Sequence, residues 1–176
     1  PKKVALSPRE YPSDYTCHIR DPKVWQEKDR YYMIQGGRRK DEKGAVLLYT
    51  SCDGENWEFN RELTTEEPFG YMWECPDLFP LGDRQVLSFS PQGLTRENYR
   101  YQNVYQSGYF LLKKDWREKQ PFENFREWDY GFDFYAPQTF QDEKGRRILV
   151  GWMGMPDSQE KYTNPLEGGW QHDLTV

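Results

Sequence analysis

The apolar residues of this chain come in short runs, a pattern that predicts β-strands rather than helices. Five runs are rich in β-branched or aromatic residues, and each is bounded by residues that favour turns. They are residues 31–34, 45–50, 85–89, 107–112 and 147–152. Pairs typical of hairpin turns, such as Asp53-Gly54 and Lys144-Gly145, stand between them, and no window keeps a helical apolar period. We therefore expect an all-β fold.

A pattern centred on proline occurs three times, at Pro22, Pro76 and Pro137. Each proline is followed by a polar residue, then an apolar residue or threonine, then an aromatic one, and each copy continues through a charged turn into an apolar strand. The prolines lie 54 and 61 residues apart, and repeats of this size with about four strands are typical of β-propeller blades. Proline suits the start of a strand, so we expect it to open each blade.

Three blades cannot close a ring, because natural propellers have at least about four. We therefore expect residues 1–176 to form a single incomplete propeller domain of about three blades. The exposed edges of its sheets would then be covered by missing blades or by self-association.

Composition points to a neutral partner. The formal net charge is −5, from 24 basic and 29 acidic residues without long blocks of one sign, which argues against a nucleic-acid-binding surface. Aromatic residues make up 17% of the chain and alternate with polar and charged ones. Such a mixture suits a site for a small sugar, although an aromatic-rich β core has the same composition.

Cysteine and histidine usage bears on location and on cofactors. Cys17, Cys52 and Cys75 are an odd number at wide spacing, so no disulfide framework is indicated and a reducing compartment is favoured. No stretch has the length and apolarity of a membrane helix. The two histidines, His18 and His172, stand at opposite ends, and no spacing suits zinc. We expect a cytoplasmic protein with no metal, no cofactor and no membrane partner.

Two carboxylates beside the first two prolines are candidates for catalysis. Glu74 lies in the run Trp73-Glu74-Cys75-Pro76-Asp77, and Asp21 lies in Arg20-Asp21-Pro22. Apolar neighbours can raise the pKa of a carboxyl group into the range that a general acid needs. With the three copies as blades, Asp21, Glu74 and Asp133 are expected to converge on one pocket.

Four motifs in order resemble those of glycoside hydrolase family 32, the invertase family of β-fructofuranosidases, and most of all its bacterial sucrose-6-phosphate hydrolases. The resemblance covers essentially the whole chain. The motifs are Arg20-Asp21-Pro22, Trp73-Glu74-Cys75-Pro76-Asp77-Leu78-Phe79, Asp133-Phe134-Tyr135-Ala136-Pro137-Gln138-Thr139-Phe140 and Gly151-Trp152-Met153-Gly154.

The resemblance implies a five-bladed propeller, of which this chain would hold roughly blades 2 to 4, followed by a β-sandwich. It also implies hydrolysis of terminal β-fructofuranosides, such as sucrose, sucrose 6-phosphate or short fructans, with retention of configuration. By position, Glu74 matches the general acid/base and Asp21 the transition-state stabiliser, with Arg20 as a donor to sugar hydroxyls. Asp133 and Trp152 match residues that line the pocket for the leaving group.

One departure from the family pattern is decisive for activity. The family's nucleophile is an aspartate in an Asn-Asp-Pro-Asn motif, and no such run occurs in the 176 residues. A retaining glycosidase needs both carboxylates. We therefore expect this chain by itself not to turn over substrate.

Simpler roles remain open for each candidate. Asp21 and Asp133 could be turn residues, Glu74 could be half of an ion pair with Arg20, and Trp152 could belong to the core. Cys75 is expected to be a packed thiol. Two other functions also remain open: a non-catalytic sugar-binding propeller fragment, and an inverting propeller glycosidase of the arabinanase and xylosidase type.

Overall fold

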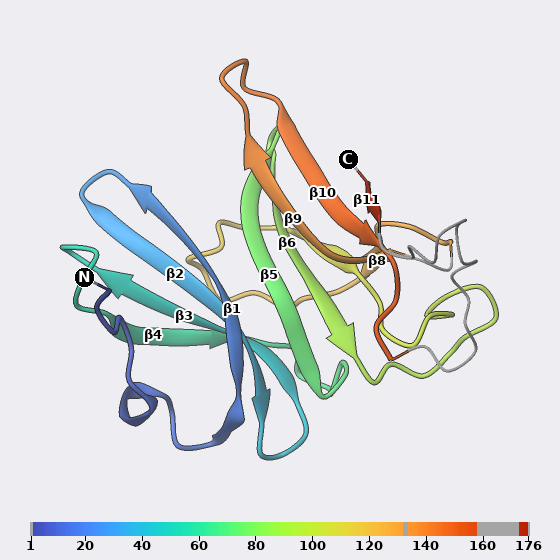
Figure 1. Cartoon of the computed structure of the whole chain (residues 1–176), viewed down its shortest axis with the longest axis horizontal. Helices are drawn as coiled ribbons and strands as arrows, with labels where there is room; N and C mark the ends of the chain where they lie inside the picture. The colour runs from blue at the N-terminus through green and yellow to red at the C-terminus, as the bar shows by residue number, and fades with distance from the viewer. Residues whose placement is uncertain (1, 132–133, 158–172, 176) are drawn as a thin grey trace.

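The structure, a computed structural model, describes residues 2–131, 134–157 and 173–175 (Figure 1). These residues form eleven strands and one short 3-10 helix, η1 (Pro8–Glu10), which confirms the all-β prediction. The strands are β1 (Tyr15–Glu27), β2 (Arg30–Arg39), β3 (Gly44–Ser51), β4 (Glu58–Leu63), β5 (Met72–Leu81), β6 (Arg84–Gln92), β7 (Gly108–Leu112), β8 (Arg126–Glu127), β9 (Tyr135–Gln141), β10 (Arg147–Met153) and β11 (Asp173–Thr175).

The strands form three antiparallel sheets in which neighbours along the chain pair with one another. Their orders are β1-β2-β3-β4, β5-β6-β7-β8 and β11-β10-β9. All five apolar runs expected to be strands lie in strands, within β2, β3, β6, β7 and β10 apart from one terminal residue. Figure 1 shows the sheets fanning out with their first strands, β1, β5 and β9, toward the same central region. This is the arrangement of neighbouring propeller blades.

The expectation that each repeat proline opens a strand is wrong. Pro22, Pro76 and Pro137 lie inside β1, β5 and β9. In each of these strands the pairing register shifts at the proline, as it does between Arg20 and Lys23. Proline donates no backbone hydrogen bond, and a bulge leaves a residue unpaired, so a proline fits within a strand at such a point.

The residue before each of these prolines has a left-handed backbone. The φ angles of Asp21, Cys75 and Ala136 are 59°, 49° and 49°. Residues before proline favour extended conformations, and a residue other than glycine in the left-handed region stores about 1–3 kcal/mol of strain. Such strain persists only where surrounding contacts impose it. The same unusual bend therefore recurs at equivalent places in three sheets.

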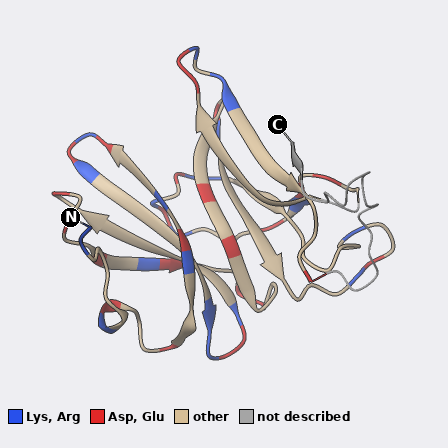
Figure 2. Cartoon of the chain, viewed as in Figure 1, with Lys and Arg blue, Asp and Glu red and all other residues tan. Residues whose placement is uncertain are grey.

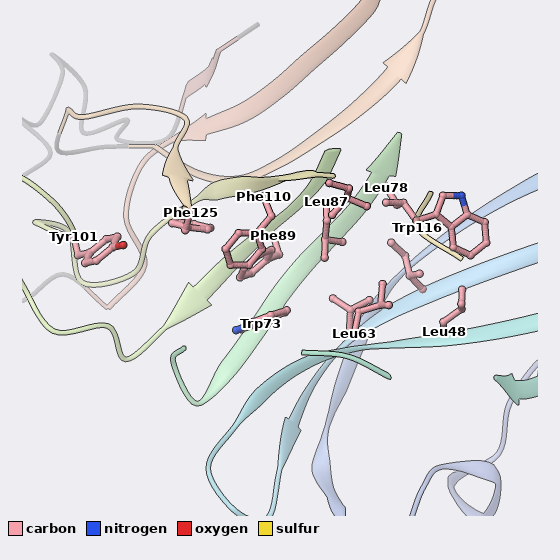
Figure 3. Close-up of a cluster of buried hydrophobic side chains, with 13 residues drawn as sticks. Leu48, Leu63, Trp73, Leu78, Leu87, Phe89, Tyr101, Phe110, Trp116 and Phe125 are labelled. Carbon is pink, nitrogen blue, oxygen red and sulfur yellow. The ribbon is translucent and has the colours of Figure 1, made fainter. Parts of the chain in front are cut away.

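An aromatic core joins the first two sheets (Figure 3). Trp73 of β5 is fully buried and stacks on Phe89 of β6, with 4.0 Å between ring centroids. The backbones also approach closely: a Cβ atom added to Gly36 of β2 would lie 2.0 Å from the carbonyl oxygen of Trp73. The two sheets therefore pack too tightly at this point for any residue larger than glycine.

The hairpin turn after β3 is held by the side chain of Asp53. Its Oδ1 accepts hydrogen bonds from the backbone N–H groups of Glu55 and Asn56, both at 2.8 Å, and these and other hydrogen bonds lower the pKa of Asp53. Trp57 packs beside the turn against a second core cluster on the far face of the first sheet. The hairpin turn predicted at Asp53-Gly54 is present between the paired strands β3 and β4.

Charged residues of both signs are interspersed over the described chain (Figure 2). β5 carries two acidic residues, Glu74 and Asp77, near its middle. No helix among the described residues has the length and apolar character needed to cross a membrane.

Candidate functional site

Side chains from three different sheets meet at one point, where Arg20 of β1 and Tyr135 of β9 both contact Glu74 of β5. Arg20, Glu74 and Tyr135 occupy equivalent positions, each directly before the left-handed residue of its strand. The guanidinium of Arg20 donates from Nε to Oε1 of Glu74 at 2.8 Å, and its Nη2 lies 2.7 Å from the same oxygen. The hydroxyl of Tyr135 donates to Oε2 of Glu74. The shared bend thus aims one residue from each sheet at a single point.

A fourth residue completes the surroundings of the Glu74 carboxylate. Gln92, at the end of β6, donates from Nε2 to Oε2 of Glu74 at 2.8 Å. Both carboxylate oxygens are therefore held by protein donors, although the side chain of Glu74 keeps 14% of its surface exposed. The preceding residue, Trp73, points the other way into the core because successive residues of a strand face opposite sides.

Asp21 lies beside the residue that follows Glu74. Its Oδ2 accepts a hydrogen bond from the backbone N–H of Cys75 at 3.0 Å and one from the Cys75 thiol at 3.5 Å. The Asp21 carboxylate is thus held by the backbone at the bend of β5. The structure brings Asp21 and Glu74 together, as expected from their motifs.

Burial and the two carboxylates act on the neighbouring thiol and phenol. The pKa of Cys75 is raised well above its usual range, first by burial and then by the charges of Asp21 and Glu74. The pKa of Tyr135 is raised as well, first by burial and then by its hydrogen bond to Glu74 and the charge of Glu74. Both groups keep their protons at neutral pH, and Cys75 is a half-buried thiol whose pKa does not suit a nucleophile.

The remaining two candidates have different outcomes. Asp133 lies outside the described residues. Trp152, on β10, pairs in register with Tyr135 and is 48% exposed, so it is not part of the core that the described residues form. It lines a cavity of about 260 Å³ together with Tyr135, Ala136, Gly154 and Pro156. Through Tyr135, this cavity adjoins the hydrogen-bonded cluster around Glu74.

Tyr135 and Gln92 were not predicted as members of the site. Tyr135 stands two residues before Pro137, as Arg20 and Glu74 stand before their own prolines. The signal for Tyr135 in the sequence is this shared position, two residues before a repeat proline. Gln92 has no such counterpart, since it reaches the site only through the pairing of β6 with β5.

The arrangement suits proton transfer. The Glu74 carboxylate is oriented through both of its oxygens, and the Asp21 carboxylate on β1 is held by the backbone N–H of Cys75 on β5. Within the described ranges, no group of three or more histidine, cysteine, aspartate and glutamate side chains is placed to hold a metal ion. Two carboxylates held in this way could serve general acid and base catalysis and the electrostatic stabilisation of a positive charge.

The family model described as the N-terminal domain of glycosyl hydrolases family 32 matches residues 2–176. The chain is 45% identical over 171 residues to a sucrose-6-phosphate hydrolase of Bacillus subtilis, covering 94% of this chain and 36% of that protein. It is 47% identical over 178 residues to one of Staphylococcus xylosus, covering all of this chain and 35% of that protein.

Among solved structures, the chain resembles a mutant of a Bombyx mori family 32 β-fructofuranosidase in complex with sucrose. The TM-score is 0.79 and the identity 41%, over 94% of this chain and 35% of that one. The chain thus spans a little over a third of the length of the relatives it matches.

Proposed function

The chain belongs to glycoside hydrolase family 32, and we propose that it forms part of the catalytic propeller of a retaining β-fructofuranosidase. The observation that carries the proposal is the Glu74 carboxylate, held by Arg20, Tyr135 and Gln92 and flanked by Asp21. Glu74 matches the acid/base of the family by position, and its carboxylate is oriented through both of its oxygens. The family match also favours this function over the arabinanase and xylosidase alternative.

Glu74 acts as the acid and then as the base. In the first step its carboxyl group protonates the glycosidic oxygen as the bond to fructose breaks, and in the second it takes a proton from the water that releases fructose. Arg20 and Gln92 approach its two oxygens from different sides, at 2.7–2.8 Å. Their contacts fix the orientation of the carboxyl group so that little reorganisation is needed when the proton moves.

Asp21 stabilises the transition state. The sugar ring develops positive charge as the glycosidic bond breaks, and a fixed carboxylate lowers the energy of that charge. The backbone N–H of Cys75 holds Asp21 in place. Arg20, which precedes Asp21 in the chain, directs Nε and Nη2 at Glu74 and Nη1 at His18.

The nucleophile comes from elsewhere in the full-length enzyme. Retention requires a second catalytic carboxylate roughly 5 Å from the acid, and the family places it in an Asn-Asp-Pro-Asn motif that the 176 residues do not contain. We therefore propose that the chain alone is inactive and that activity belongs to the whole enzyme. The chain would then hold about three blades of a five-bladed propeller.

The proposed substrates are sucrose, sucrose 6-phosphate and short fructans. The names of the curated relatives and the sucrose in the Bombyx mori complex support a small fructoside. The cavity lined by Trp152 and Tyr135 is suited to the leaving sugar, because an aromatic ring can pack on the C–H face of a sugar. A cytoplasmic location is part of the proposal, supported by three cysteines that are all free.

The test is hydrolysis by the full-length enzyme that contains this chain. We expect release of fructose from sucrose or sucrose 6-phosphate, with the β configuration in the first-formed product by NMR. Glu74→Gln should lower kcat by about 10²–10⁴-fold, whereas Glu118→Gln, in an exposed loop, should leave it unchanged. Inversion of configuration would contradict the assignment, and binding of sugar without any hydrolysis would favour the non-catalytic alternative.

A further inference from the structure

A second layer of polar side chains lies behind the site, on the other side of the three strand bends. Lys23, Asp77 and Gln138 each follow one of the repeat prolines, as Arg20, Glu74 and Tyr135 precede them. The Nζ of Lys23 lies 3.3 Å from Oδ2 of Asp77 and 3.3 Å from Oε1 of Gln138. The three sheets are therefore joined twice, once in front of the bends and once behind them.

Asp77 is the centre of this second layer. Its side chain is only 1% exposed, and its Oδ2 accepts hydrogen bonds from the backbone N–H and the hydroxyl of Thr139, both at 2.7 Å. Lys23 also donates to the backbone carbonyl of Thr139 at 2.6 Å. Every one of these donors comes from a sheet other than that of Asp77, so the contacts tie β1, β5 and β9 together.

The second layer reaches the site through Cys75. Gln138 donates from Nε2 to the backbone carbonyl of Cys75 at 2.8 Å. Cys75 is the left-handed residue directly after Glu74, and its N–H holds Asp21. A shift of Gln138 or Lys23 would thus move the backbone on which both carboxylates depend.

We propose that Lys23, through Asp77, Thr139 and Gln138, is a positioning residue that holds Glu74 and Asp21 in their reactive arrangement. The inference rests on the proposed function. Stability alone does not account for this partly buried pair, because replacing both partners of such a pair by apolar residues is often neutral, even though removing one partner alone is costly. The Lys23–Asp77 pair lies next to the three strained bends that position the site residues, so we connect it with catalysis.

The test uses Lys23→Met in the full-length enzyme, which removes the ammonium and keeps a long unbranched side chain. We expect kcat for sucrose 6-phosphate to fall on the order of 10–100-fold, the scale of a small misplacement of catalytic groups, with little change in KM. Lys23→Arg should recover most of the activity, since it restores the charge. Lys144→Met, in the exposed turn after β9, serves as the matched control.

A second variant covers the case in which Lys23→Met does not fold. Thr139→Val keeps the shape and removes one donor to Asp77, so kcat should again fall with little change in KM, and Thr50→Val, on β3, is its control. A variant that loses only thermal stability, with wild-type kcat for each folded molecule, would overturn the inference. A wild-type enzyme that hydrolyses no β-fructofuranoside would contradict the proposed function instead.

Discussion

Arg20 directs two nitrogens at the same oxygen of Glu74, with Nε at 2.8 Å and Nη2 at 2.7 Å. The other oxygen is left to Tyr135 and Gln92. The planar guanidinium makes this double contact possible, and an ammonium group presents its donors in a different geometry. The orientation of Glu74 therefore depends on the shape of the Arg20 side chain as well as on its charge.

Arg20→Lys in the full-length enzyme should lower kcat at least about 10-fold while the protein stays folded. The positive charge remains, but the fork that fixes Oε1 is lost. The measurement is steady-state kinetics with sucrose or sucrose 6-phosphate. Arg126→Lys, on the exposed strand β8, should retain wild-type kinetics, and equal effects of the two changes would argue against an orienting role for Arg20.

Tyr135→Phe should lower kcat by about 10-fold with a smaller effect on KM. Its hydroxyl is a donor to Glu74, and its raised pKa keeps it protonated through the alkaline range in which free tyrosine ionises. Tyr109→Phe is a suitable control because the Tyr109 ring packs on Trp128. A Tyr135→Phe enzyme with unchanged kcat would show that Arg20 and Gln92 are sufficient to orient Glu74.

Cys75 should be the slowest of the three cysteines to react with iodoacetamide in the native protein. Its pKa is raised by burial and by Asp21 and Glu74, so little thiolate forms at neutral pH. Cys17 and Cys52 are exposed. Peptide mass spectrometry after timed labelling at pH 7 measures the three rates, and labelling of Cys75 as fast as the other two would show that the site is open.

Gly36→Ala should lower the free energy of unfolding by about 1–3 kcal/mol. The new methyl group would collide with the backbone carbonyl of Trp73, which cannot move without shifting β5. Gly131→Ala is the control, because the nearest atom there belongs to the end of the Asp129 side chain and not to backbone, so at most the hydrogen bond from Gly131 N–H to that carboxylate is lost. Urea unfolding of both variants measures the difference.

Asp53 should contribute stability that is lost in acid. Its pKa is depressed in the folded state by hydrogen bonds to the turn, so the contribution is fully present above the unfolded pKa of about 3.9 and disappears as pH falls through the lower folded value. Unfolding of wild type and Asp53→Asn should therefore differ most above about pH 4 and converge below it. A constant difference across this range would exclude the carboxylate as the cause.

The parts of the fold that depend on neighbouring residues could be predicted from the sequence. The apolar runs of β3 and β6 and the turn at Asp53 each carry their own signal. The bends at the repeat prolines could not be predicted, because a left-handed residue before proline is locally unfavourable and exists only through contacts between sheets.

The same distinction holds for the site. Asp21 and Glu74 were predicted from their motifs, and the structure brings them together. Tyr135 carries a signal in the sequence, since it stands two residues before its proline as Arg20 and Glu74 do. Gln92 was missed because it reaches the site through the pairing of β6 with β5, which no single segment reveals. The proposed sugar contact of Asp133 stays a prediction.

The equivalence of Arg20, Glu74 and Tyr135 has a consequence for evolution and for engineering. The same backbone position in three sheets carries a guanidinium, a carboxylate and a phenol, and these three groups meet at one point. A substitution at one of these three positions changes the chemical group that is presented at this point. Exchanging Arg20 and Glu74 between their positions would keep an ion pair and move the carboxylate to a different sheet.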